Sequence, residues 1–330
     1  MRRSQVSSRY ALTEADPHRN LESFAAAVEA GLGARPKTLP CRFLYDERGS
    51  ALFEEICKLP EYYLTRAEHQ VLTDHADEIA AAFSTPIALV ELGSGSSTKT
   101  RVLIEALLRR QPRLRYVPVD ISRSMLEETA ESLLEDYGAL EVHAIAGEYQ
   151  EGLRHVRNET RPKMIAWLGS NVGNFERGNA GRFLRGIRDV LSESDRVLIG
   201  IDLRKDRERL ERAYDDRGGV TARFNLNLLA RINRELDGGF DLDRFAHRAE
   251  WQEHEGRVKL GLESLEAQEI TIKGIDRVVR FERGELIHTE DSFKYSFAEI
   301  DDLAESSGLA LSQRWLDNAG AYSLNLFRPA

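Results

Sequence analysis

Short apolar runs alternate with segments of helical periodicity through the middle of the chain. Five runs have the length and continuity of buried parallel strands: 87–90, 116–119, 141–146, 164–168 and 197–201. Apolar residues at helical spacing predict helices between them, over 98–110, 125–134 and 180–191. Strand alternating with helix is typical of an α/β protein with an open, doubly wound parallel sheet.

The pattern differs at both ends of this block. Before it, helical spacing predicts helices over 21–32 and 66–83, and the first 19 residues are polar and without periodicity. After Asp202 come predicted helices over 205–214 and 221–236, then alternating strand-like residues over 245–292, typical of an antiparallel sheet. A helix over 297–307 and strands over 309–315 and 321–327 complete the chain.

This order predicts two domains, one inserted into the other. We expect the parallel-sheet domain to comprise 67–203 and 295–330. A second, α+β domain comprises 20–66 and 204–294. Residues 1–19 are expected to form a loose N-terminal arm because they lack apolar periodicity.

Composition narrows the class of protein. The 330 residues carry a net charge of −9, with 42% hydrophobic and 31% charged residues, as in an ordinary globular protein. No apolar stretch approaches the roughly 20 residues that span a bilayer. We therefore expect no nucleic-acid or membrane partner, a cytoplasmic location and a monomer. Cys41 and Cys57 are too few for a disulfide framework, and no metal-ligand spacing is present, so no metal site is expected.

A glycine turn follows the first strand of the block. Gly93, Ser94 and Gly95 stand between a buried strand and a helix, where glycine lets the backbone approach a ligand. Asp120 ends the next strand about 25 residues later, where a carboxylate can accept both hydroxyls of a ribose. The alternative is that Asp120 caps the helix that begins near Ser122.

Several separated motifs resemble the histidine-specific Nα-methyltransferases of ergothioneine biosynthesis, which use S-adenosylmethionine (SAM). Besides the glycine turn, they are Leu44–Ser50, Leu59–Tyr63, Leu168–Asn174, Ala213–Asp216, Phe224–Asn227 and Thr289–Lys294. The resemblance extends from about Leu39 to the C-terminus. It implies a Rossmann-like methyltransferase domain with an inserted substrate domain.

The resemblance also implies a cofactor site. SAM, which leaves as S-adenosylhomocysteine, would be held by Gly93, Ser94, Gly95, Lys99, Asp120, Glu148 and Tyr149. The last two depart from the family's usual Asp-Phe pair. The longer carboxylate of Glu148 can still accept from the adenine amino group, and the ring of Tyr149 can still stack.

Substrate residues are implied in the same way. Tyr62, Asn174 and Tyr214 match positions that hold the amine and carboxylate of histidine, and Glu290 and Ser292 match those that recognise its imidazole. Pocket positions match Tyr45, Phe53, Gly169 and Leu260, the last commonly methionine in the family. In isolation, a lone tyrosine is more typical of a core residue, and Glu290, Ser292 and Lys294 are typical of a solvated strand face.

The implied reaction transfers three methyl groups in succession from SAM to the α-amine of L-histidine and gives hercynine. Tyr62 and Asn174 are the expected catalytic residues, because they would orient the amine, and no general base stands out. Two alternatives remain. One is N-methylation of another aromatic amino acid, against which a buried Glu290 argues. The other is a non-catalytic sensor that binds SAM or an amino acid.

Overall fold

The computed structural model describes residues 2–14, 23–157 and 159–330. It divides into two compact units. The sheet unit contains the described residues of Met1–Arg19, Leu64–Arg204 and Tyr295–Ala330, and the insert unit those of Asn20–Tyr63 and Lys205–Lys294. The boundaries expected from the sequence fall after residues 66, 203 and 294.

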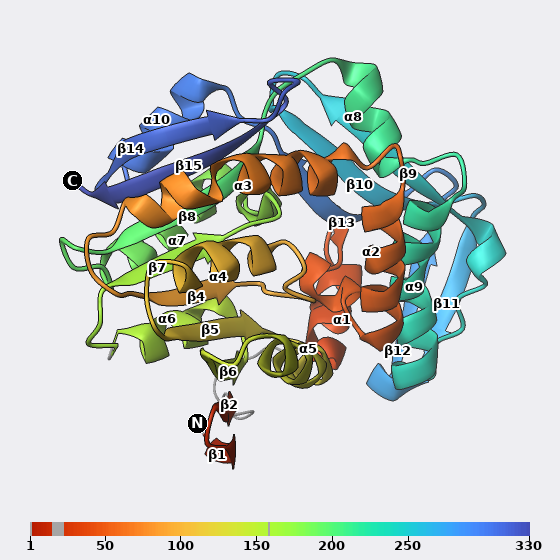
Figure 1. Ribbon diagram of the computed structural model, residues 1–330. Coiled ribbons are helices and arrows are strands. Elements are labelled where there is room, and N and C mark those ends of the chain that lie inside the picture. The colour runs from red at the N-terminus through yellow and green to blue at the C-terminus, as the bar shows by residue number, and fades with distance from the viewer. Residues whose placement is uncertain (1, 15–22, 158) are drawn as a thin grey trace. The chain divides into compact units, whose positions relative to one another are not determined.

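The sheet unit is built on one large, mostly parallel sheet (Figure 1). Among the described residues its strands are β1 (Arg2–Ser7), β2 (Tyr10–Glu14), β4 (Ala88–Leu92), β5 (Leu114–Asp120), β6 (Leu140–Ala146), β7 (Lys163–Trp167), β8 (Arg196–Asp202), β14 (Leu309–Leu316) and β15 (Tyr322–Pro329). Their order is β1-β2-β6-β5-β4-β7-β8-β15-β14. Strands β2 and β4 to β8 run parallel, and β15 pairs with β8 antiparallel. All five predicted parallel strands are confirmed.

Helices connect these strands. They are α3 (Tyr63–Ala81), α4 (Thr100–Leu108), α5 (Arg123–Asp136), α6 (Tyr149–Val156), the 3₁₀ turn η2 (Asn171–Asn174), α7 (Arg177–Arg188) and α10 (Phe297–Glu305). From β4 the chain adds β5 and β6 on one side, and β7 and β8 on the other. The sheet order therefore reverses beside β4, the place where ligands bind in open α/β sheets. The doubly wound, Rossmann-like prediction is confirmed.

The N-terminal prediction was wrong for the described residues. Instead of a loose arm, β1 and β2 form an antiparallel hairpin, and β2 pairs with β6. Tyr10, Ala11 and Leu12 are buried, so three consecutive apolar residues suffice to anchor this edge. Part of the expected arm, 15–19, and the first residues of the helix expected over 21–32 lie outside the described residues.

The insert unit combines a small sheet, a two-stranded ribbon and several helices. The sheet order is β3-β13-β10-β9, and β11 pairs with β12. Its strands are β3 (Lys37–Thr38), β9 (Phe245–Gln252), β10 (Arg257–Ser264), β11 (Gln268–Ile272), β12 (Arg277–Phe281) and β13 (Leu286–Phe293). Its helices and 3₁₀ turns are α1 (Phe24–Gly33), η1 (Cys41–Leu44), α2 (Glu47–Lys58), α8 (Arg207–Tyr214), α9 (Val220–Leu236), η3 (Leu242–Arg244) and η4 (Lys273–Ile275).

Helix α9 forms the centre of this unit, because it packs against α2 and against strands β9 to β11. Strands β10 and β13 pair antiparallel with a bulge after Leu260, where Gly261 faces His288. A Cβ atom on Gly261 would lie 2.7 Å from the carbonyl oxygen of Ile287. The bulge therefore requires glycine, and it sets the register in which Leu260 lies opposite Glu290.

Candidate active site

The glycine turn and Asp120 form one hydrogen-bonded structure at the carboxyl ends of β4 and β5. Gly93 and Gly95 have φ of +75° and +49°, values that favour glycine. One carboxylate oxygen of Asp120 accepts from the backbone N–H of Gly95 at 2.9 Å, and the other from that of Ser122 at 2.9 Å. Asp120 does not cap the following helix, because the side chain of Ser122 takes that role.

The glycine turn packs closely against neighbouring side chains and carries an unpartnered polar group. A Cβ atom on Gly93 would lie 2.9 Å from the phenol oxygen of Tyr149 and 3.1 Å from Asn171 Nδ2, so only glycine fits against these side chains. The buried hydroxyl of Ser94 has no hydrogen-bond partner among the residues that the structure describes. The unpartnered hydroxyl fits a polar cofactor that lies against the backbone here.

Glu148 and Tyr149 lie where α6 begins. Tyr149 is the first helical residue, and Glu148 is its N-cap, without a side-chain capping bond. The ring of Tyr149 packs against Trp167 and Phe183, with ring centroids 6.0 and 5.6 Å apart. Tyr149 is therefore held by an aromatic cluster beside the glycine turn.

A buried carboxylate stabilises the glycine turn through hydrogen bonds. It was not among the residues predicted from the sequence. Glu91, on β4, accepts from Thr100 Oγ1 at 2.5 Å and from the phenol of Tyr116. Tyr116 also bonds to Ser97 Oγ at 2.7 Å, within the turn. Burial raises the pKa of Glu91 to about 7. Glu91 is therefore a structural support, since both of its carboxylate oxygens have partners.

The end of β7 carries two more predicted residues. Gly169 has φ of +75°, and its N–H donates to the carboxylate of Glu68 at 2.7 Å. The same carboxylate accepts from Lys99. Asn174 is the last residue of η2 and is half-buried. The structure thus links Lys99 to Gly169 through Glu68, a residue that the sequence analysis missed.

In the insert unit, the predicted aromatic residues form one cluster. Tyr45 packs edge-on against Phe53, with centroids 5.4 Å apart, and Phe53 lies 6.2 Å from Tyr62. Tyr62 packs edge-on against Tyr214 at 6.0 Å. Phe224 of α9 completes the cluster, 5.5 Å from Tyr45. Burial raises the pKa of Tyr62 well above its ordinary value, so its phenol stays neutral.

Tyr214 and Ser292 meet around a buried lysine. Their hydroxyl oxygens are 2.7 Å apart, and Lys294 Nζ donates to each at 2.7 Å. An ammonium group only donates, so both oxygens accept from Lys294 and one hydroxyl hydrogen joins the pair. A solvated strand face is excluded, because Lys294 and Ser292 are 0% and 4% exposed.

Glu290 precedes this triad on β13. It lies opposite Leu260 in the register of β10 and β13, so two predicted pocket residues are neighbours across the strands. Burial raises the pKa of Glu290 to about 7, against the opposing influence of Lys294. The carboxyl is therefore poised to change charge near neutral pH.

A buried histidine lies behind Tyr214. His247 Nε2 is 2.8 Å from the carbonyl oxygen of Tyr214, and its Nδ1 is 2.9 Å from Asn225 Nδ2. Burial lowers the pKa of His247, so the ring is neutral; Nε2–H donates to the carbonyl and Nδ1 accepts from the amide. His247 thereby fixes the backbone at the end of α8, where Tyr214 lies.

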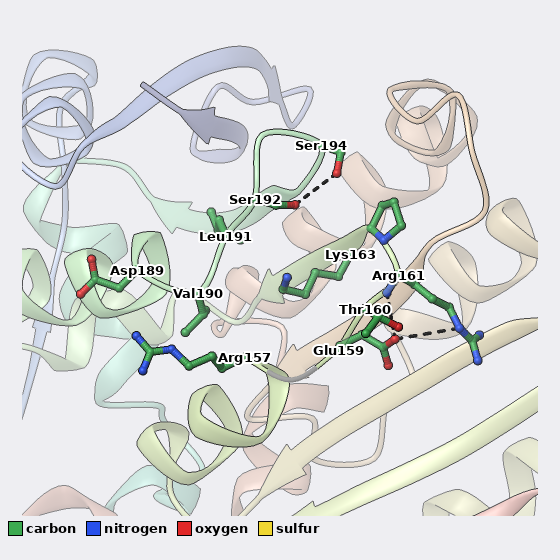
Figure 2. A pocket seen from close by; sticks show the side chains of 11 residues that line it. Arg157, Glu159, Thr160, Arg161, Lys163, Asp189, Val190, Leu191, Ser192 and Ser194 are labelled. Atoms are coloured by element: carbon green, nitrogen blue, oxygen red, sulfur yellow. Dashed lines mark hydrogen bonds and ion pairs between the residues drawn. The ribbon is translucent and has the colours of Figure 1, made fainter.

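A separate polar cavity of about 320 Å³ lies at the amino ends of β7 and β8, the edge of the sheet opposite the glycine turn (Figure 2). None of the predicted site residues lines it. Its buried Lys163 donates to Asp195 at 2.6 Å, and Asp195 also accepts from the backbone N–H of Lys163 and of Ser192. These bonds hold the starts of β7 and β8 together. We therefore interpret the buried polar groups of this cavity as part of the fold and not as a ligand site.

A parallel sheet whose order reverses beside a glycine turn, with an acid on the neighbouring strand, defines an α/β protein that binds a nucleotide-like cofactor. Residues 24–329 match the sequence model of a family described as "Histidine-specific methyltransferase, SAM-dependent". The chain belongs to this family, and it is a SAM-dependent methyltransferase.

Similar proteins include a "Histidine N-alpha-methyltransferase" from Mycobacterium tuberculosis, 41% identical over 91% of this chain and 92% of its own. The "Ergothioneine biosynthesis protein 1" of Neurospora crassa is 34% identical over 85% of this chain, which spans only 32% of that longer protein. An "L-tryptophan methyltransferase trpM" from Psilocybe serbica is 30% identical over 91% of both chains.

Among solved structures, a magnesium protoporphyrin IX methyltransferase from Synechocystis with bound SAM aligns over 88% of this chain, at 10% identity and a TM-score of 0.46. That likeness is too weak to bear on the site. In the described part of the chain, no helix has the length and apolarity to cross a membrane.

Proposed function

We propose that this protein transfers methyl groups from SAM to the α-amine of L-histidine, three in succession, and forms hercynine for ergothioneine biosynthesis. The observation that carries the proposal is the polar end of the insert unit's aromatic cluster, where a carboxyl poised near neutral pH precedes a hydroxyl pair held by a buried lysine. The 41% identity to a mycobacterial histidine Nα-methyltransferase supports it.

Glu290 and Ser292 would recognise the imidazole. An ionised Glu290 is an acceptor for a ring N–H, and the hydroxyl of Ser292 can donate to the unprotonated ring nitrogen. Histidine is the amino acid whose side chain offers a donor and an acceptor on one aromatic ring. A phenylalanine ring would leave the buried carboxylate without a partner, at a cost of several kcal/mol.

The amino-acid end would be held by neutral groups. On binding, the hydroxyl hydrogen of Tyr214 would turn from Ser292 to the substrate carboxylate, while the phenol oxygen still accepts from Lys294. Tyr62, a neutral phenol, and Asn174, in the sheet unit, would orient the α-amine. Neutral groups suit a substrate that gains methyl groups, because no fixed charge opposes the cation that forms.

Bound SAM supplies an electrophilic methyl group on a sulfonium. The residues of this chain would contribute mainly position, because a displacement needs only the amine lone pair in line with that methyl. The proton of each successive amine would leave to solvent, since none of the residues proposed here is placed as a base. Tyr45 and Tyr62 can face the trimethylated cation, which favours completion of all three transfers.

The test is incubation of the enzyme and SAM with each of the twenty amino acids, followed by tandem mass spectrometry. We expect methylation of histidine alone, on the α-nitrogen, and conversion of mono- and dimethylhistidine to the trimethyl product. Preferred methylation of tryptophan, as the name of the Psilocybe relative suggests for that protein, would replace histidine as the substrate. Absence of turnover with every amino acid would favour a sensor.

A further inference from the structure

Glu68 is a wholly buried carboxylate at the centre of the sheet unit. It projects from α3 and is 0% exposed. One oxygen accepts from the phenol of Tyr322 at 2.6 Å and from the N–H of Gly169 at 2.7 Å. The other accepts from Lys99 Nζ and, at 3.0 Å, from the same Gly169 N–H.

The surrounding structure makes room for this carboxylate. Gly200 lies in the middle of β8, where glycine ordinarily weakens a strand. A Cβ atom there would lie 2.2 Å from Glu68 Oε1 and 2.3 Å from the Tyr322 phenol oxygen. Burial raises the pKa of Tyr322 well above its ordinary value, so the phenol keeps its proton and donates. The fold therefore accommodates this hydrogen-bond network specifically, through a glycine on β8 and a phenol donor on β15.

We infer that Glu68 is a positioning residue for the amino-acid end of SAM. Its carboxylate holds the ammonium of Lys99 and the turn at Gly169, two places on either side of the strand order reversal. SAM carries its only anion on the amino-acid tail, and a lysine ammonium has three donors. Because Glu68 fixes the position of its ammonium, Lys99 would meet that carboxylate in a constant direction.

Glu68 acts through Lys99 and does not bind the ligand. Each of its oxygens already has two donors in the structure. Its counter-charge is also what allows an ammonium to lie partly buried, since Lys99 is 26% exposed at its side chain. The inference rests on SAM dependence, and it is independent of which substrate is methylated.

The experiment compares two ligands by calorimetry, without any amino-acid substrate. S-adenosylhomocysteine carries the amino-acid tail, whereas 5′-methylthioadenosine lacks it. Glu68→Gln keeps an oxygen for Gly169 and Tyr322 but turns an amide NH₂ toward Lys99. We expect S-adenosylhomocysteine to bind about tenfold more weakly or worse, and 5′-methylthioadenosine to stay within about threefold of the wild type.

Tyr322→Phe is the matched control, because it removes one donor from the same carboxylate and leaves Lys99 in place. Its affinity for S-adenosylhomocysteine should stay within about threefold of the wild type. Once Lys99→Met has been made, adding Glu68→Gln should cause no further loss of affinity for S-adenosylhomocysteine. This double variant removes the buried carboxylate and its counter-ion together, so neither charge is left unpaired. Equal losses for both ligands, equal losses in Tyr322→Phe, or unchanged binding in Glu68→Gln would each overturn the inference.

Discussion

Two half-buried carboxylates, Asp120 in the sheet unit and Glu290 in the insert unit, are held in opposite ways. Asp120 accepts from the backbone N–H groups of Gly95 and Ser122, so strand and turn geometry fix both oxygens. Burial raises its pKa, while these N–H groups favour the ionised form. Glu290 has a pKa raised to about 7, and the influence that opposes burial is the charge of Lys294.

The difference shows how each unit can serve its ligand. A carboxylate fixed by backbone is preorganised for hydroxyl groups, which suits a cofactor that is the same in every turnover. A carboxyl with a pKa near 7 ionises more readily when a substrate side chain donates a hydrogen bond to it. This property suits discrimination among substrate side chains. Changes at Asp120 should therefore affect SAM alone, and changes around Glu290 the amino acid alone.

The largest effect is expected from removing the buried ammonium. Lys294→Met deprives Tyr214 and Ser292 of a charged donor, and two such hydrogen bonds are worth about 1.5–3 kcal/mol each. We expect kcat/KM for histidine to fall about 100-fold or more, with S-adenosylhomocysteine binding unchanged by calorimetry. Lys273→Met, at an exposed position in the same unit, is the control and should behave as the wild type.

Asp120→Ala should weaken SAM binding about tenfold or more, because it removes the acceptor expected for the ribose hydroxyls. The dissociation constant of SAM measures this loss, and histidine binding in the presence of saturating SAM should be retained. Asp136→Ala, an exposed carboxylate on α5, provides the comparison. Equal SAM affinity in the wild type and Asp120→Ala would remove this carboxylate from the cofactor site.

Glu290→Gln should cost about 1–3 kcal/mol of histidine affinity and leave SAM binding unchanged. Because the pKa of Glu290 is about 7, the wild-type carboxyl is protonated at pH 6 and ionised at pH 8. The wild-type KM for histidine should therefore fall as pH rises through 7, and that dependence should be smaller in Glu290→Gln. Identical pH profiles would mean that the imidazole does not meet Glu290.

The last effect concerns the stability of the protein without ligands. Below about pH 4.5 the carboxyl is protonated in both states, whereas at higher pH the unfolded chain releases a proton that folded Glu290 retains up to about 7. Wild-type stability therefore falls over this window. Glu290→Gln should be more stable by about 1–3 kcal/mol at pH 8, and equal at pH 4, in urea unfolding. A destabilised variant at pH 8 would show that the carboxylate is well paired in the folded protein.

The strands and most helices could be predicted from the sequence because their signals are local. The apolar run 87–90 and the glycines after it suffice to place a buried strand and a turn. The hairpin of β1 and β2 was not predicted, because its only run of buried apolar residues in the described part is three residues long. The helices α2 and α6 were also missed, since the aromatic motif around α2 and the cofactor pair at α6 concealed ordinary helical spacing.

The site was predictable where a residue follows a strand or belongs to a motif, as Asp120 and Tyr214 do. Glu68 could not be found in this way, because its partners Lys99, Gly169 and Tyr322 are 31, 101 and 254 residues away. Lys294 looked like part of a solvated face, since alternation along a strand shows which residues share a face but not whether that face is buried. Its hydrogen-bond partner Tyr214 lies on α8, 80 residues away in the chain.

The N-terminal hairpin also determines which strand lies at the border of the sheet. A strand at the border of a sheet presents a row of backbone N–H and C=O groups that can pair with a second molecule. Strand β2 covers the long, buried strand β6 along five paired positions, and β1 in turn covers β2. Loss of the first 14 residues would uncover β6 as a template for intermolecular strand addition. The hairpin thus moves the border of the sheet from the parallel strand β6 to the N-terminal strand β1.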